Sequence, residues 1–234
     1  MSALITAKDL SFRYDKSERR LLDRVNLAVN AGEAVAVVGL SGVGKSTLCY
    51  CLSGIIPHVY QGELEGEVLL DGMPVKAMSL PQIATKLGIV FQNPDHQLFS
   101  FTVEDELAFG PENLCLPREE IDARITSALE KVGLAHLRLA NPQQLSGGQR
   151  QLVALAAVLC LQPSVLIFDE AMSQLDSDGK KRIKEMILRL KAEGKAIVMI
   201  EHEPENLEVA DRVLLLAEGK LVPFAGVLPE ATEG

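Results

Sequence analysis

Residues 39–47, GLSGVGKST, restrict the possible fold more than any other stretch of the chain. They fit the pattern GxxxxGK[ST], follow the apolar run AVAVVG and precede a segment that we expect to be helical from Lys45 to about Ser53. A strand, a glycine-rich turn and a helix in this order direct free backbone N–H groups and a helix N-terminus at one point. The pattern therefore predicts a phosphate site, with Lys45 reaching the β- and γ-phosphates and the Ser46 hydroxyl binding Mg²⁺.

Short apolar strands alternate with expected helices over most of the chain. AIVMI is a continuous apolar run, and VLIFDE is an apolar run that ends in two acids, as is typical of buried parallel strands. One expected helix carries its apolar residues on a single face, namely Ile183, Met186, Ile187 and Leu190. We therefore predict an α/β fold with a P-loop NTPase core, a largely parallel sheet and an antiparallel β subdomain. The section from about residue 80 to 139 is expected to form a helical subdomain.

Composition narrows the class of protein further. The net charge of −9 argues against sequence-blind binding of nucleic acid, because neutralising phosphates needs an excess of Lys and Arg. The four cysteines show no metal-ligand spacing, so we expect them to be small buried residues in a reducing compartment. The longest apolar run, LVALAAVLCL, is too short to cross a bilayer, and no signal peptide is indicated. We therefore expect an intracellular chain whose role at a membrane would depend on a partner.

Two acidic residues end the run VLIFDE. The carboxyl ends of parallel strands are where α/β sheets bind their ligands. Beside a phosphate-binding turn, Asp169 is expected to hold Mg²⁺, through water, and Glu170 is placed to polarise an attacking water molecule.

The segment LSGGQ, residues 145–149, opens another expected helix. It offers a second set of free N–H groups and a hydroxyl for phosphate. One phosphate-binding turn already holds one triphosphate, so a second anion site needs an explanation. The simplest is that the two sites serve two nucleotides that are shared across a dimer.

GLSGVGKST, LSGGQ, VLIFDE, SQLD and IEHE, in that order, closely resemble the nucleotide-binding subunits of ABC transporters, over nearly the whole chain. The resemblance implies a single ABC ATPase domain over residues 1–234 that binds ATP and Mg²⁺ in a head-to-tail dimer. It assigns ATP contacts to Tyr14, Gly39, Ser41, Gly42, Gly44, Lys45, Ser46, Thr47, Ser146, Gly147, Gly148, Gln149 and Asp176. It assigns metal contacts to Ser46, Gln92 and Asp169, and catalysis to Lys45, Gln92, Glu170 and His202. In these roles Tyr14 stacks on adenine, Asp176 links the two sites across the interface, and His202 senses the γ-phosphate.

The segment FQNPDHQLFSFTVEDELAFGPENL contains four of the seven Phe residues. The resemblance places Gln92 in the loop that touches Mg²⁺ or the attacking water at one end and a membrane partner at the other. Residues 92–109 are therefore expected to contact an integral membrane coupling subunit. Phe91 and Phe109 are expected to pack the core of the helical subdomain. Phe99 and Phe101 fit either that core or a groove for the partner.

The sequence of this segment resembles that of the ATPases of energy-coupling factor (ECF) transporters, which import vitamins and transition-metal ions. Residues 56–68, IPHVYQGELEGEV, look like the tandem-ATPase branch, although Ala171-Met172 departs from the common Pro-Thr. We therefore expect a peripheral protein on the cytoplasmic face of the cell membrane that reaches a substrate-binding subunit indirectly. The second ATPase domain could be identical, different or fused. The alternatives are the ATPase of a conventional ABC importer or exporter, and a soluble ABC-type ATPase.

Overall fold

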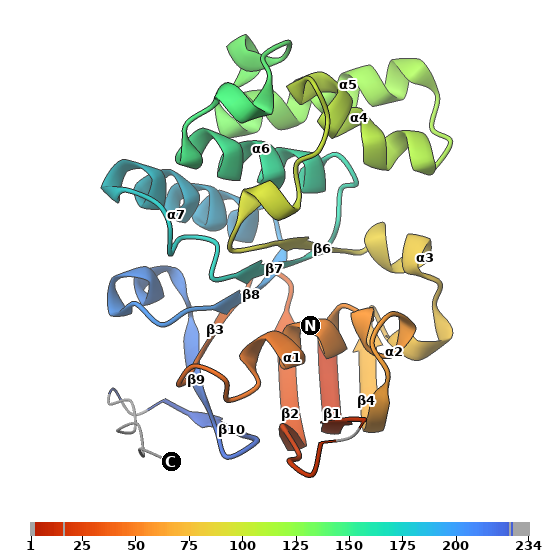
Figure 1. The fold of residues 1–234 in the computed structure, drawn as a ribbon, viewed down its shortest axis with the longest axis vertical. Coiled ribbons are helices and arrows are strands. Elements are labelled where there is room, and N and C mark those ends of the chain that lie inside the picture. The colour runs from red at the N-terminus through yellow and green to blue at the C-terminus, as the bar shows by residue number, and fades with distance from the viewer. Residues whose placement is uncertain (1–2, 16, 225, 227–234) are drawn as a thin grey trace.

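Two β-sheets form the framework of the computed structural model, which describes residues 3–15, 17–224 and 226 (Figure 1). The smaller sheet is antiparallel, with the strand order β2 (Leu22–Asn30), β1 (Ala3–Tyr14), β4 (Gly62–Leu70), β5 (Met73–Pro74). The larger sheet has the order β10 (Lys220–Pro223), β9 (Arg212–Ala217), β3 (Ala34–Val38), β8 (Ala196–Ile200), β7 (Val165–Asp169), β6 (Leu87–Val90). All its neighbouring strands are parallel except β10 and β9, which form a hairpin.

The helices divide between the two faces of the larger sheet. On one face lie α1 (Lys45–Leu52), α2 (Ile55–His58) and α3 (Leu80–Ala84), on the side of the smaller sheet. On the other face lie α6 (Gly147–Leu159) and α7 (Ser177–Ala192), and beyond α6 lie α4 (Val103–Asn113) and α5 (Arg118–Val132). Short 3₁₀ helices form at 75–77, 94–96, 135–137, 142–144 and 204–209. Helix α5 ends at Gly133, whose φ of 73° is the left-handed conformation that a helix stop of this kind requires.

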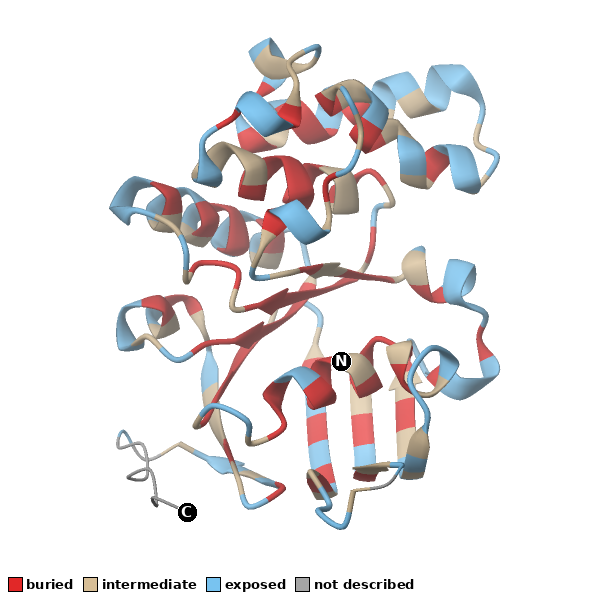
Figure 2. Cartoon of the chain, in the orientation of Figure 1, coloured by how far each residue is buried: buried red, intermediate tan, exposed pale blue. Residues whose placement is uncertain are grey.

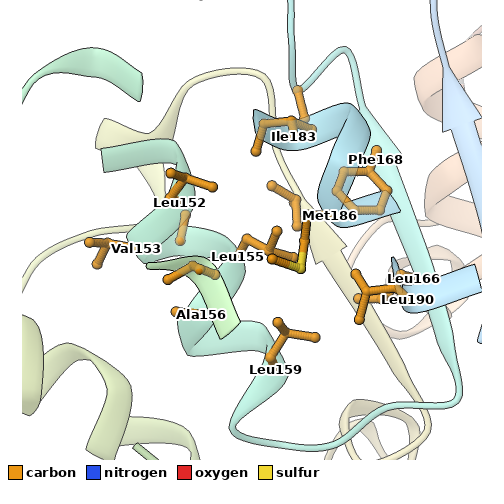
Figure 3. Close-up of a cluster of buried hydrophobic side chains, with 14 of the residues drawn as sticks. Leu152, Val153, Leu155, Ala156, Leu159, Leu166, Phe168, Ile183, Met186 and Leu190 are labelled. Carbon is orange, nitrogen blue, oxygen red and sulfur yellow. The ribbon is translucent and has the colours of Figure 1, made fainter. Parts of the chain in front are cut away.

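The central strands are buried because both of their faces are covered (Figure 2). On β7, Leu166 and Phe168 pack among residues of α6 and α7, as Figure 3 shows. Val165 and Ile167 point to the opposite face and join a second core with α1 and the smaller sheet. The alternating use of two apolar faces explains why these strands are apolar at successive positions, with Asp169 at the end of β7 as the exception.

The fold class predicted from the sequence is confirmed, including the strands at both ends of the chain that pair antiparallel. One strand was not anticipated: β6 lies inside the 80–139 section and pairs with β7 in the larger sheet. The expectation that Phe109 packs a core is wrong, because half of it is exposed and its ring contacts Phe99 edge-on at 4.8 Å. Three cysteines are buried as expected, but Cys115 is exposed. The division at residues 80 and 139 stays a prediction.

Candidate active site

The turn between β3 and α1 depends on two glycines. A Cβ on Gly39 would lie 2.6 Å from the carbonyl oxygen of Leu216 on β9, so the close approach of these chains needs glycine. Gly44 precedes the first residue of α1 with a φ of 115°, which L side chains rarely adopt. The turn therefore presents its backbone and the N-terminus of α1 toward one point, as a phosphate site requires.

Lys45 is buried at this turn. Its Nζ donates hydrogen bonds to the carbonyl oxygens of Gly39 at 2.9 Å and Leu40 at 3.0 Å. The same Nζ lies 3.9 Å from Oε1 of Glu170, which directly follows strand β7. The turn thus holds the ammonium in place, with its charge directed to the carboxyl ends of the strands.

A cavity of about 430 Å³ opens at this point and collects residues from distant parts of the chain. Its lining consists of Leu21, Ser41, Gly42, Gly44, Lys45, Ser46, Thr47, Gln92, Asp169 and Glu170. We call it the P-loop cavity. All of these except Leu21 are residues that the sequence predicted for nucleotide, metal or catalysis. Its oxygen donors include the Ser46 hydroxyl, the Gln92 amide and the Asp169 carboxyl, a set that suits Mg²⁺ held together with phosphates. Among the described residues no protein-only cluster of three His, Cys, Asp or Glu could hold a metal.

Asp169 and Glu170 differ in environment although they are adjacent. Burial, together with the negative charge of Glu170, raises the pKa of Asp169 to about 6, and Lys45 offsets part of this shift. Glu170 has a positive φ of 50°, and its backbone N–H donates to the carbonyl oxygen of Ile200 at 3.0 Å. His202 Nδ1 lies 3.8 Å from Glu170 Oε2. Glu170 therefore stands between an ammonium and an imidazole at the edge of the cavity.

Gln92 is linked to the acidic pair by Ser173, the first residue of SQLD, for which the sequence predicted no role. Its Nε2 donates to Ser173 Oγ at 3.1 Å, and that hydroxyl donates to the carbonyl oxygen of Glu170 at 2.9 Å. On the other side, Gln151 of α6 donates to the carbonyl oxygen of Phe91 at 2.9 Å. The bonds from the Gln92 and Gln151 side chains join residues 81 and 60 positions apart, so no local pattern could have revealed them.

A second cavity of about 420 Å³ forms at the N-terminus of α6. It is lined by Ser146, Gly147, Gly148, Gln149, Gln174, Asp176, Asp178, Gly179 and Arg182, and we call it the LSGGQ cavity. Ser146 caps α6: its Oγ accepts from the Gln149 N–H at 3.3 Å, and Gln149 Oε1 accepts from the Ser146 N–H at 3.0 Å. The sequence predicted Asp176 and the LSGGQ residues here, but not Gln174, Asp178 or Arg182. Within the described residues the two cavities share no lining residue.

Three predicted residues line neither cavity. Gly39 supports the turn by its close packing on β9. Tyr14 ends β1 and contacts Phe12 edge-on at 4.8 Å between ring centroids. His202 is partly exposed and contacts the cavity through Glu170. Their nucleotide contacts stay predictions.

Comparison with known proteins agrees with this geometry. A family model described as ABC transporter matches residues 22–173. The energy-coupling factor transporter ATP-binding protein EcfA of Methanosarcina acetivorans is 43% identical over 94% of this chain and 78% of its own length. The corresponding protein EcfA1 of Oenococcus oeni is 40% identical over 93% and 77%. The solved structure of cbiO1 from Clostridium perfringens, described as part of the ABC transporter complex cbiONQ, superimposes with a TM-score of 0.85 at 32% identity, covering 95% of this chain and 88% of that one. The chain therefore belongs to the family of ABC transporter ATP-binding proteins.

Proposed function

We propose that the chain is the ATP-hydrolysing subunit of an energy-coupling factor importer for vitamins or transition-metal ions. Relatives named as energy-coupling factor ATP-binding proteins, at 40–43% identity over more than nine-tenths of the chain, support the transporter class. The observation that carries the hydrolytic activity is the P-loop cavity, which brings Lys45, Ser46, Gln92, Asp169 and Glu170 together.

Each of these residues has a distinct task in phosphoryl transfer to water. The amides of the glycine-rich turn and Lys45 bind the phosphate oxygens and offset the charge that develops on the γ-phosphoryl group. Ser46, Gln92 and Asp169 would hold Mg²⁺, which when bound would offset charge on the phosphates. Glu170 accepts a hydrogen bond from the attacking water and orients it in line with the leaving oxygen. His202, whose Nδ1 lies 3.8 Å from Glu170 Oε2, senses the γ-phosphate.

The separation of the two cavities supports a shared site. A nucleotide in the P-loop cavity leaves the LSGGQ cavity of the same protomer open, although α6 offers it a capped helix N-terminus suited to phosphate. In a head-to-tail dimer the LSGGQ cavity of one protomer covers the triphosphate in the other. Hydrolysis removes the γ-phosphate that bridges the protomers, so the dimer reopens.

A group of three Phe residues supports a membrane partner. Phe101 is 86% exposed, Phe99 63% and Phe109 50%. The loop that carries the first two is fixed, because Oε2 of the buried Glu106 accepts from the N–H groups of Phe99 at 2.9 Å and Ser100 at 2.8 Å. No described helix is both long and apolar enough to span a bilayer. We therefore assign this surface to an integral coupling subunit, with the chain at the cytoplasmic face and the substrate-binding subunit reached indirectly.

The decisive experiment replaces Glu170 by Gln and measures both ATP turnover and sedimentation with Mg²⁺ and ATP. We expect little turnover and an ATP-dependent dimer, because the water is no longer oriented while phosphate binding is kept. Glu218→Gln is a matched control, since Glu218 is exposed and shares a positive φ of 50° with Glu170. Unchanged hydrolysis by Glu170→Gln, or no dimer with ATP, contradicts the proposal.

The transporter class is tested by purifying the chain from its native membranes. We expect an integral coupling subunit together with a small substrate-binding membrane protein. Phe101→Ser should lose this co-purification, whereas Leu139→Ser, another strongly exposed apolar residue of the chain, should retain it. Recovery of a conventional two-permease assembly would show an ordinary ABC transporter instead.

A further inference from the structure

The segment after β8 contains two buried polar side chains that have no place in the mechanism above. Glu201 is 1% exposed and Asn206 is fully buried. Asn206 Nδ2 donates to Glu201 Oε2 at 3.1 Å and to Glu203 Oε2 at 3.4 Å. Within the described part of the chain, Glu201 Oε1 and Asn206 Oδ1 have no hydrogen-bond partner. The side chains of Glu201 and Asn206 are therefore in contact, yet each has a buried acceptor oxygen without a donor.

An ionised Glu201 would be a poorly compensated buried anion. The nearby cations are committed elsewhere: Lys180 Nζ contacts Glu203, and His202 Nδ1 lies toward Glu170. Burying a carboxylate without its own cation is costly, and the group usually takes up a proton instead. A protonated carboxyl gains an O–H donor, while a carboxylate only accepts. A single proton on Glu201 thus neutralises the buried carboxylate. It also supplies an O–H donor beside the two acceptor oxygens that lack one.

We propose that Glu201 is protonated in the folded protein and that its acid–amide contact with Asn206 positions the loop carrying His202. The backbone at this point is already tied to the active site. The N–H of Glu201 donates to the carbonyl oxygen of Val37 at 3.1 Å, on the strand that leads into the glycine-rich turn. The preceding carbonyl, of Ile200, accepts from the N–H of Glu170.

Glu201 is a positioning residue, because it acts through the neighbouring His202 and not on nucleotide or water. Asn206 lies in the 3₁₀ helix Pro204–Val209, so its contact with Glu201 holds that helix against the end of β8. His202 lies between these two anchored points. The effect on catalysis rests on the role proposed above for His202, whereas the protonation of Glu201 does not.

The surroundings of Glu201 determine how its contribution to stability changes with pH. The charged groups there are His202 and Glu203 from its own segment and Lys180 from α7. Burial, with a smaller contribution from the charge of Glu203, raises the pKa of Glu201. The hydrogen bond from Asn206, the charge of His202 and the His202 backbone N–H oppose the rise. A carboxyl whose pKa is higher in the folded than in the unfolded chain binds its proton more tightly when folded. Its contribution is complete below the unfolded pKa and is lost as the pH rises through the folded value.

The protonation is tested by urea unfolding of the wild type, Glu201→Gln and Glu205→Gln at a series of pH values from 5 to 9. The amide in Glu201→Gln keeps one donor and one acceptor but cannot ionise. We expect its urea midpoint to exceed that of the wild type by a margin that grows with pH. Glu205 is exposed in the same segment, so Glu205→Gln should follow the wild type at every pH. A margin that stays constant, or a wild type that is the more stable at alkaline pH, overturns the protonation.

The positioning role is tested by ATP turnover over the same pH range. We expect kcat of the wild type to fall on the alkaline side relative to Glu201→Gln, with KM for ATP unchanged, and Asn206→Ala to lower kcat at all pH values. A constant ratio of the two kcat values across pH overturns the positioning role. If no variant hydrolyses ATP, the proposed function fails and the positioning role with it, while the unfolding series still decides the protonation independently.

Discussion

Glu106 offers a quantitative test of how the exposed aromatic loop is held. Its buried carboxylate accepts the N–H groups of Phe99 and Ser100 at 2.9 and 2.8 Å. A hydrogen bond to a charged group contributes about 1.5–3 kcal/mol, so two sum to about 3–6 kcal/mol. After truncation the loop can turn both N–H groups to water, which favours the lower end of that range. We therefore expect Glu106→Ala to lower the free energy of unfolding by about 3 kcal/mol.

The assay is urea unfolding followed by circular dichroism, where a slope of about 3 kcal/mol per M converts this loss to a midpoint shift of about 1 M. Glu112→Ala is the matched control, since Glu112 lies on the same helix and is exposed. The chain has no Trp, so Phe99→Trp gives a single fluorescent reporter on the loop. Its emission should shift to longer wavelength when Glu106 is truncated. Equal midpoints for the two Glu variants, or unchanged emission, would refute the reasoning.

Three other perturbations have equally definite outcomes. Gly39→Ala brings a Cβ to 2.6 Å from the Leu216 carbonyl oxygen and should cost about 1–3 kcal/mol in thermal unfolding, whereas Gly147→Ala, with open space around it, should cost less. Tyr14→Ala should weaken ATP binding by roughly 5- to 150-fold, the equivalent of one stacked base, and leave binding of inorganic triphosphate unchanged in calorimetry. A thiol reagent should label one cysteine, Cys115, in the native protein and all four after unfolding.

The sequence predicted well those parts of the fold that are determined by residues close together in the chain. Four consecutive apolar residues on β7 indicate a strand buried on both faces, and Gly133 marks the end of α5. Strand β6 was missed because it is only four residues long and contains Gly88. A Cβ on Gly88 would lie 2.2 Å from Val158 of α6, so this glycine allows β6 and α6 to approach closely. Such a contact leaves no periodic signal in its own segment.

The same distinction applies to the candidate site. The glycine-rich turn and the LSGGQ segment carry their chemistry in contiguous residues, and both line cavities. Ser173 and Gln151 act through hydrogen bonds to residues 81 and 60 positions away, which only the folded chain brings together. Phe109 was misplaced because residue type alone suggested burial. Its position on α4 directs it to the surface, where it packs on the ring of Phe99.

The loop that follows β7 has contacts with both cavities. Glu170 lines the P-loop cavity, and Asp176, six residues later, lines the LSGGQ cavity and caps α7 by accepting from the Gly179 N–H at 2.8 Å. Between them, Ser173 bonds to the Gln92 side chain. In the proposed dimer each protomer places this loop beside both nucleotides. We expect a shift of Glu170 at one nucleotide to be passed along the backbone to Asp176 at the other, and through the Ser173 hydroxyl to the side chain of Gln92. The two proposed routes would thus diverge at Ser173, one along the backbone and the other through its hydroxyl.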